Sequence, residues 1–207
     1  MTTRTAITLP GLEIDDGFDL IKADPPWRFV TRSRKGITAK GAGGQYRTMS
    51  LEDIKSMPVA DVDAPDCVLW LWATNPMLPQ AFDVMDAWGF TFKTAGHWAK
   101  TTRHGKLAFG TGYLLRCAGE PFLIGTRGRP KTASNVRSVV MGPVREHSRK
   151  PDESFAAAEQ LVSRDVIGRD PRRLELFSRQ EREGWTVWGD QTGKFDACQQ
   201  GVLPIED

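Results

Sequence analysis

The sequence is poor in the two residues that most often hold metals. Its three cysteines lie far apart and form no Cys-x-x-Cys pair: Cys67, Cys117 and Cys198. Its three histidines show no metal-ligand spacing: His97, His104 and His147. The sequence therefore predicts no metal centre, neither a zinc ribbon nor a redox pair, and thiols that stay reduced in a cytosolic protein.

Long apolar runs are also missing. No stretch approaches the roughly 20 apolar residues that span a bilayer, and residues 1–10 lack the apolar region of a secretory signal. We therefore expect a cytoplasmic protein with no membrane contact. At 207 residues, with 40% hydrophobic and 26% charged residues, the composition is that of one globular domain.

Acidic residues are scarce in two long stretches. Residues 28–47 contain six basic residues and no acid, and residues 100–150 contain eleven basic residues against two acids. The formal net charge of the whole chain is only +2, so the remainder is strongly acidic. Cations gathered in two loop-rich stretches indicate a polyanionic partner such as nucleic acid, although charged loops that are merely solvated give the same pattern.

The most informative motif is Asp24-Pro25-Pro26-Trp27, which follows an apolar run typical of a buried strand. Proline fixes φ and has no N–H, and the residue before each proline is pushed toward an extended backbone. The carbonyls of Asp24 and Pro25 can therefore be held outward as acceptors, beside the Asp24 carboxylate and the stacking face of Trp27. This claw suits a planar base with an exocyclic amine, and a plain Pro-Pro turn is the alternative.

Strand and helix patterns alternate along the chain. We expect strands at residues 18–24, 67–74, 90–99, 121–125, 139–141, 173–177 and 185–188. We expect helices from Ser50, over residues 79–88, and from a first turn at Pro151 to about residue 162. This alternation predicts an α/β fold with a doubly wound, mostly parallel sheet, whose ligands lie at the carboxyl ends of the strands. The single domain fills residues 1–207 with a core of about 18–192, and three loops are expected to be mobile: 28–45, 101–112 and 128–137.

Glu175 stands in the middle of the apolar strand Leu174-Glu175-Leu176-Phe177. A lone acid there is costly unless it has a partner. The hydroxyls of a ribose could satisfy both carboxylate oxygens, and pairing with Arg172 or Arg173 is the alternative.

These features resemble the S-adenosylmethionine-dependent amino-methyltransferases. The Asp-Pro-Pro-Trp form resembles the adenine-N6 family of the seventy-kilodalton subunit of the eukaryotic mRNA adenosine methyltransferase, the MT-A type. The likeness covers about residues 18–192, and it includes Ser148-Arg149-Lys150-Pro151-Asp152-Glu153 and a tail from Leu174 to Gln191. Because the claw precedes the cofactor strand in the chain, the resemblance implies a Rossmann-like methyltransferase fold with permuted motif order.

The resemblance also implies S-adenosylmethionine as cofactor, with Lys150 on its methionine carboxylate and Glu175 on its ribose. The full set it assigns to the cofactor is Asp24, Lys150, Glu175, Phe177, Arg179, Asp190 and Gln191. The chain departs from the family pattern at two places. Ser178 stands where a glycine is frequent, and residues 180–183 are charged where His or Asn often contacts the cofactor. The cofactor contacts of these positions are therefore in doubt.

The catalytic motif by this resemblance is Asp24, Pro25, Pro26 and Trp27. Trp27 and Tyr46 would lie against the base, with Asn75 near it, although core packing of Tyr46 is equally open. The exposed cations expected to bind nucleic acid are Arg28, Arg32, Arg34 and Lys35.

The implied reaction is methyl transfer to the exocyclic N6 amine of adenine in nucleic acid. Resemblance to short homologues from prokaryotic or phage-infected cells favours DNA over RNA. Three rivals remain: an inactive nucleic-acid-binding relative that serves a partner, an amino-methyltransferase acting on protein glutamine or on cytosine, and a generic α/β ligand binder. A homodimer or a partner subunit is compatible with the sequence, which is silent on target sequence and strandedness.

Overall fold

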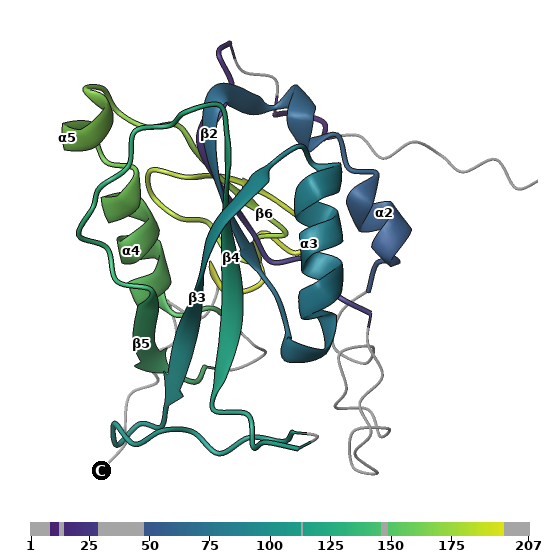
Figure 1. Ribbon diagram of the computed structural model, residues 1–207, viewed down its shortest axis with the longest axis vertical. Helices are drawn as coiled ribbons and strands as arrows, with labels where there is room; N and C mark the ends of the chain where they lie inside the picture. The colour runs from purple at the N-terminus through teal and green to yellow at the C-terminus, as the bar shows by residue number, and fades with distance from the viewer. Residues whose placement is uncertain (1–8, 13–14, 29–47, 113, 146–148, 197–207) are drawn as a thin grey trace, which may run out of the picture.

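A seven-stranded sheet runs through the molecule in the order β5-β3-β4-β2-β1-β6-β7 (Figure 1). The computed structural model describes residues 9–12, 15–28, 48–112, 114–145 and 149–196. The strands are β1 (Phe18–Ala23), β2 (Asp63–Trp72), β3 (Thr91–Thr101), β4 (Gly119–Arg127), β5 (Val139–Pro143), β6 (Arg173–Leu176) and β7 (Thr186–Trp188). The helices are α2 (Leu51–Lys55), α3 (Leu78–Ala87), α4 (Asp152–Leu161) and α5 (Arg164–Ile167), with 3₁₀ turns η1 (Val59–Asp61) and η2 (Asn75–Met77).

The direction of the strands brings several chain segments to one edge of the sheet. Four of the six neighbouring pairs are parallel, and only the two pairs that involve β4 are antiparallel. β1 lies between β2 and β6 and is parallel to both. The carboxyl ends of these three strands therefore meet at one edge, where the chain leaves β1 for the claw. The predicted α/β fold with a mostly parallel sheet is confirmed.

Both faces of the sheet are buried, because side chains alternate along each strand. In β2, Leu69 and Leu71 belong to one core, and Trp70 and Trp72 to the other. Helices α2 and α3 cover the first face and α4 covers the second (Figure 1). This double covering explains why β2 reads as a continuous apolar run instead of an alternating one.

The helix ends largely follow the local signals. Ser50 caps α2 by accepting the Asp53 N–H at 3.1 Å, and α3 stops before Gly89, whose φ of 78° is left-handed. Two expectations were wrong in detail: β2 begins at Asp63, four residues before the predicted start, and Pro151 is the extended N-cap of α4 instead of a first-turn residue. None of the helices in the described part of the chain is long and apolar enough to cross a membrane.

Candidate active site

The Asp24-Pro25-Pro26-Trp27 claw leaves the carboxyl end of β1 and is held from both neighbouring strands. The Asp24 N–H donates to the carbonyl of Leu176, the last residue of β6, at 3.4 Å. The indole N–H of Trp27 donates to the carbonyl of Trp72, the last residue of β2, at 3.2 Å. The claw is therefore fixed relative to both strand ends.

Hydrogen bonds inside the claw limit which acceptors can face a ligand. The Pro25 carbonyl accepts the N–H of Trp27 at 2.8 Å, and the Pro26 carbonyl accepts the N–H of Met49 at 3.0 Å. A carbonyl has two lone pairs, so Pro25 keeps one. The Trp27 side chain is only 3% exposed and packs in the core on the α3 face. Its packing positions the turn, and its stacking against a base stays a prediction.

A chain of alternating charges holds the Asp24 carboxylate. Lys150 Nζ lies 2.8 Å from Asp24 Oδ2 and 2.9 Å from Glu120 Oε1. Lys100 Nζ lies 2.9 Å from the other Glu120 oxygen. The second oxygen of Asp24, Oδ1, accepts no hydrogen bond from the described residues. Asp24 is thus oriented by one partner and keeps one oxygen for a ligand.

The pKa values in this chain follow from the pairing. Burial alone would raise the pKa of Glu120, but the charges of Lys150 and Lys100 outweigh burial and hold it below its usual value. Burial would lower the pKa of Lys150, but Asp24 and Glu120 raise it above its usual value. Lys150 therefore stays an ammonium group and Glu120 a carboxylate at neutral pH.

A small, open cleft adjoins the claw at the ends of β1 and β6. It brings together five of the seven residues predicted for the cofactor: Asp24, Lys150, Glu175, Phe177 and Arg179. Four other lining residues were not predicted from the sequence: Arg149, Phe155, Gln180 and Phe195. Of the remaining two predicted residues, Asp190 is exposed and the Gln191 side chain accepts from Lys194 Nζ at 3.2 Å, and neither lines the cleft.

Glu175 is the acid of the cleft. The Ser178 hydroxyl donates to Glu175 Oε2 at 2.8 Å, and no described residue donates a hydrogen bond to the other oxygen. The alternative partner Arg172 is occupied by Asp16 and Asp19 instead. Ser178, which departs from the family pattern, thus orients Glu175 and leaves one of its oxygens open.

Two further features of the cleft indicate a polar ligand. Gln180 Oε1 is buried and has no hydrogen-bond partner among the described residues, which is costly unless a ligand supplies a donor. Phe177 has a φ of 65°, a conformation that an aromatic residue rarely adopts and that is often found at ligand sites. The turn after β6 therefore carries an unpaired buried acceptor and a costly backbone conformation beside the cleft.

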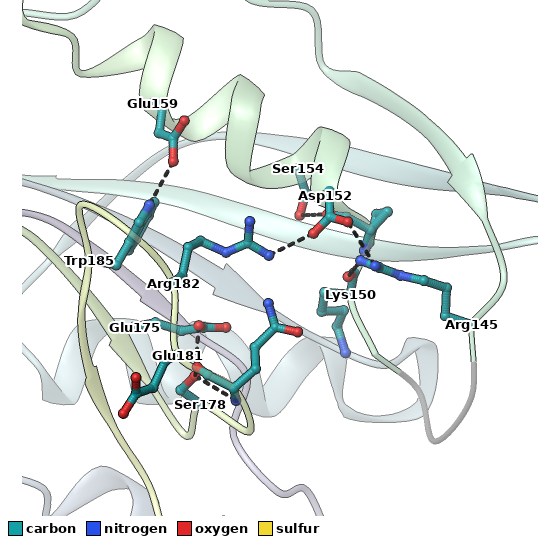
Figure 2. A network of polar contacts seen from close by, with 12 residues as sticks. Arg145, Lys150, Asp152, Ser154, Glu159, Glu175, Ser178, Glu181, Arg182 and Trp185 are labelled. Carbon is teal, nitrogen blue, oxygen red and sulfur yellow. Dashed lines mark hydrogen bonds and ion pairs between the residues drawn. The ribbon is translucent and has the colours of Figure 1, made fainter. Parts of the chain in front are cut away.

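Figure 2 shows a polar network between the start of α4 and the turn after β6. Arg182 and Arg145 both bind Asp152 at the start of α4, at 2.6 and 2.8 Å. Arg145 also donates to the Lys150 carbonyl at 2.6 Å. These contacts join the turn after β6 to the segment that carries Lys150. The link across this network could not be predicted from the sequence, because Arg182 lies 30 positions from Asp152 in the chain.

Residues predicted for the substrate are only partly described. Arg28 is exposed directly after the claw. Asn75 is exposed after β2, at the same edge of the sheet, and its amide lies 3.8 Å from Cys117 Sγ. The other predicted substrate residues lie outside the described residues: Arg32, Arg34, Lys35 and Tyr46.

The basic stretch from residue 100 to 150 does not form one surface. Four of its cations are paired inside the fold: Lys100, Arg127, Arg145 and Lys150. Arg129 and Lys131 follow β4, which runs opposite to β2, so they lie at the edge far from Asp24. Among the described residues of this stretch, the exposed cations on the claw's edge lie in the loop between β3 and β4, at the bottom of Figure 1: Arg103, Lys106 and Arg116.

A larger and more open groove lies at the opposite, amino end of β1 and β6, where Phe18, Arg172, Arg173 and Trp185 line it. It contains no residue predicted for catalysis or for the cofactor, and Arg172 is already paired with Asp16. The claw and the acid of β6 thus place the chemistry at the carboxyl edge.

The α/β sheet is mostly parallel and carries an Asp-Pro-Pro-Trp claw at the end of its strand β1. An acid follows later in the chain on the neighbouring strand β6. Together these features define a Rossmann-like methyltransferase domain with permuted motif order. The chain belongs to the MT-A70 family, whose profile matches residues 18–191.

Three relatives illustrate the breadth of this similarity. The chain is 30% identical over 202 residues to the N(6)-adenine-specific methyltransferase METTL4 of Homo sapiens, covering 90% of the chain and 40% of the relative. It is 27% identical over 196 residues to an N(6)-adenosine-methyltransferase MT-A70-like protein of Arabidopsis thaliana, covering 92% and 26%. It is 26% identical over 206 residues to the Type II methyltransferase M.MunI of Mycoplasma sp, covering 90% and 83%. The chain therefore spans well under half of the human and plant proteins.

Proposed function

We propose that this protein transfers a methyl group from S-adenosylmethionine to the N6 amine of adenine in nucleic acid. The observation that carries the proposal is the position of Asp24. Its carboxylate keeps a free oxygen at the mouth of a cleft that also holds Glu175. The name of the human relative gives N6 of adenine as the acceptor, and the name of the Mycoplasma relative supports methyl transfer.

The donors and acceptors of the cleft fit S-adenosylmethionine. The open oxygen of Glu175 would bind the ribose hydroxyls, and the unpartnered Gln180 Oε1 would accept from another donor of the ligand. Lys150 Nζ has three N–H donors and uses two of them on Asp24 and Glu120, so one would remain for the methionine carboxylate. When bound, the cofactor supplies an activated methyl group.

Asp24 and Pro25 hold the amine in this proposal. An adenine amine is a poor nucleophile because its lone pair is delocalised into the ring. Asp24 Oδ1 and the free lone pair of the Pro25 carbonyl would accept its two N–H groups and favour a pyramidal nitrogen. Positive charge develops on that nitrogen as it is methylated, and the Asp24 carboxylate stabilises the charge where it forms. The hydrogen bond from Lys150 keeps the carboxylate in place.

The substrate would approach across the loop between β3 and β4. This loop carries four strongly exposed apolar side chains, Leu107, Phe109, Leu114 and Leu115. The Arg116 guanidinium lies 4.4 Å from the centre of the Phe109 ring. Cations bind phosphates and aromatic faces stack on unpaired bases. The loop could therefore stabilise a base flipped out of a duplex, which costs a few kcal/mol.

Methylation of defined oligonucleotides tests the proposal. The purified protein and cofactor are incubated with single- and double-stranded DNA and RNA, and the digested nucleosides are measured by mass spectrometry. We expect N6-methylated adenine nucleoside, and we propose DNA as the substrate on the resemblance to short family members. Methylated cytosine, or methyl transfer to protein only, would contradict the assignment to adenine.

A further inference from the structure

Lys22 is the most unexpected residue of the core. It lies within β1, its side chain is 1% exposed, and it is flanked by the core residues Ile21 and Ala23. Its Nζ donates to the Ser154 hydroxyl on α4 at 2.6 Å. No carboxylate in the described part of the chain forms an ion pair with it. A buried ammonium group without a direct counter-charge costs several kcal/mol.

Aromatic rings replace part of the lost water around Lys22. Its Nζ lies 3.6 Å from the centre of the Phe155 ring, and 5.4 and 5.3 Å from the rings of Trp70 and Trp72. The Arg182 guanidinium lies 3.7 Å from the same Phe155 ring. Two cations this close to one ring centre have to lie on opposite faces, so Phe155 separates them.

The counter-charge of Lys22 lies on the next strand. Lys22 and Glu175 are register partners in the parallel pair of β1 and β6. The neighbours of both residues pack in the core on the α3 face, so Lys22 and Glu175 point to the same face, toward α4. Glu175 is also the acid that lines the cofactor cleft. Lys22 is thus the neighbour, on the adjacent strand, of the proposed ribose-binding residue.

The charges around the two groups are consistent with mutual dependence. Burial lowers the pKa of Lys22 well below its usual value; Glu175 and Asp24 counteract this, whereas Arg182 and Lys150 add to it. Burial raises the pKa of Glu175; Lys22, the Ser178 hydroxyl and Arg182 oppose this, whereas Asp24 adds to it. Removal of Lys22 would leave Glu175 with less opposition to protonation.

We propose that Lys22 is a positioning residue of the cofactor site, whose buried positive charge keeps Glu175 ionised and so keeps its open oxygen available as an acceptor for the ligand. This inference rests on the proposed function, because it assumes that Glu175 binds the ribose. A purely structural role does not require the charge, since an apolar side chain of similar volume, such as methionine, would fill the site without the cost of burying an ammonium group.

The test measures the affinity for S-adenosylhomocysteine by calorimetry between pH 6 and pH 8.5. In Lys22→Met the pKa of Glu175 rises, so Glu175 takes up a proton as the pH falls and loses an acceptor. We expect the affinity of Lys22→Met to fall about tenfold further than that of the unmodified protein between pH 8.5 and pH 6. Lys55→Met, which removes a half-buried lysine of α2 on the other face of the sheet, should leave affinity and pH profile unchanged.

Glu175→Gln separates the possible failures. It should weaken binding and make it insensitive to pH, and adding Lys22→Met to it should introduce no new pH dependence. If Glu175→Gln weakens binding but Lys22→Met follows the unmodified pH profile, the role of Lys22 is refuted and the proposed function stands. If the unmodified protein binds no cofactor, or Glu175→Gln binds equally well, both the site assignment and the role of Lys22 fail. Lys22→Gln, which keeps a donor for Ser154 and removes the charge, gives the same test should the methionine variant not fold.

Discussion

Asp24 meets two requirements at the scale of a single residue. One oxygen is held by Lys150 at 2.8 Å, and the side chain is still 24% exposed toward the cleft. A fully buried carboxylate would need hydrogen-bond donors from the protein for all of its acceptor sites. Partial exposure with one fixed oxygen therefore suits a group that binds a transient ligand.

Asp24→Asn should abolish most of the methyl transfer. The variant keeps the shape and a hydrogen-bond acceptor but removes the charge that stabilises the methylated nitrogen. We expect the turnover rate to fall about 100- to 1,000-fold, while the dissociation constant of the cofactor changes by less than about threefold. Tritium transfer from labelled cofactor measures the rate. The matched control Asp83→Asn changes an exposed acid of α3 and should be fully active; an active Asp24→Asn enzyme would contradict the assigned role.

Ser178→Ala should weaken cofactor binding without loss of the fold. The Ser178 hydroxyl lies 2.8 Å from Glu175 Oε2 and 2.7 Å from the Gln180 carbonyl. Alanine removes the hydroxyl and with it both contacts, so that neither the Glu175 side chain nor the turn at Gln180 is held by residue 178. The loss of about one hydrogen bond, ~1 kcal/mol, corresponds to about a fivefold weaker affinity. Calorimetry measures the affinity of this variant and of the control Ser134→Ala, which changes an exposed serine outside the cleft. Equal affinities for the two variants would remove Ser178 from the site.

β1 is the element on which the site depends. Its carboxyl end carries the claw, and its amino end is tied to the segment before β6 through Asp19. Arg169 binds both Asp19 oxygens at 2.6 and 2.8 Å, and the Arg172 N–H donates to Asp19 at 2.8 Å. These bonds fix the register of β1 against β6, which in turn places Asp24 beside Glu175.

Asp19→Asn should therefore destabilise the fold in a pH-dependent way. Burial alone would raise the pKa of Asp19, but the hydrogen bonds from Arg169 and Arg172 outweigh it and lower that pKa. An acid with a lowered pKa in the folded state stabilises the protein above its unfolded pKa, and the stabilisation is lost as the pH falls through the folded value.

We expect Asp19→Asn to lose about 2 kcal/mol of unfolding free energy at pH 7. The difference from the unmodified protein should shrink as the pH falls below about 4. Urea unfolding at several pH values measures both. Asp16→Asn, which removes the 81% exposed partner of Arg172, should have little effect; a pH-independent loss in Asp19→Asn would show that the charge is unimportant.

The two edges of the sheet differ at the scale of the whole molecule. The carboxyl edge carries the claw, the cleft and a loop with exposed cations and apolar side chains. Arg129 and Lys131 belong to the opposite edge, beyond the end of β4. A nucleic acid bound for methylation should therefore contact the first set of cations and not the second.

Paired substitutions at the two edges test this asymmetry. Lys106→Ala with Arg116→Ala should weaken oligonucleotide binding and reduce the slope of log affinity against log salt by about two, one for each lost phosphate contact. Arg129→Ala with Lys131→Ala removes the same charge from the far edge and should change neither. Fluorescence anisotropy over a salt series measures both, and equal losses in the two variants would indicate nonspecific attraction only.

The sequence by itself determined the class of fold and the identity of the claw. Apolar runs and helix signals are local, so residues such as Ser50, Gly89 and the Asp24-Pro25-Pro26-Trp27 motif could be interpreted without coordinates. Glu175 was also found from the sequence, because an acid in an apolar strand is unusual. Lys22 is equally unusual and could have been found by the same signal.

Only the tertiary structure decided which charges meet. Lys150 lies 126 positions from Asp24 in the chain, and its pairing with Asp24 and Glu120 depends on β1 and β5 ending, and β4 beginning, at one edge. In the folded chain about half of the cations of residues 100–150 either form ion pairs within the protein or lie at the far edge of the sheet. Net charge alone could not reveal this distribution. Electrostatic contacts act through space, so the register of the strands, not the spacing in the sequence, decides them.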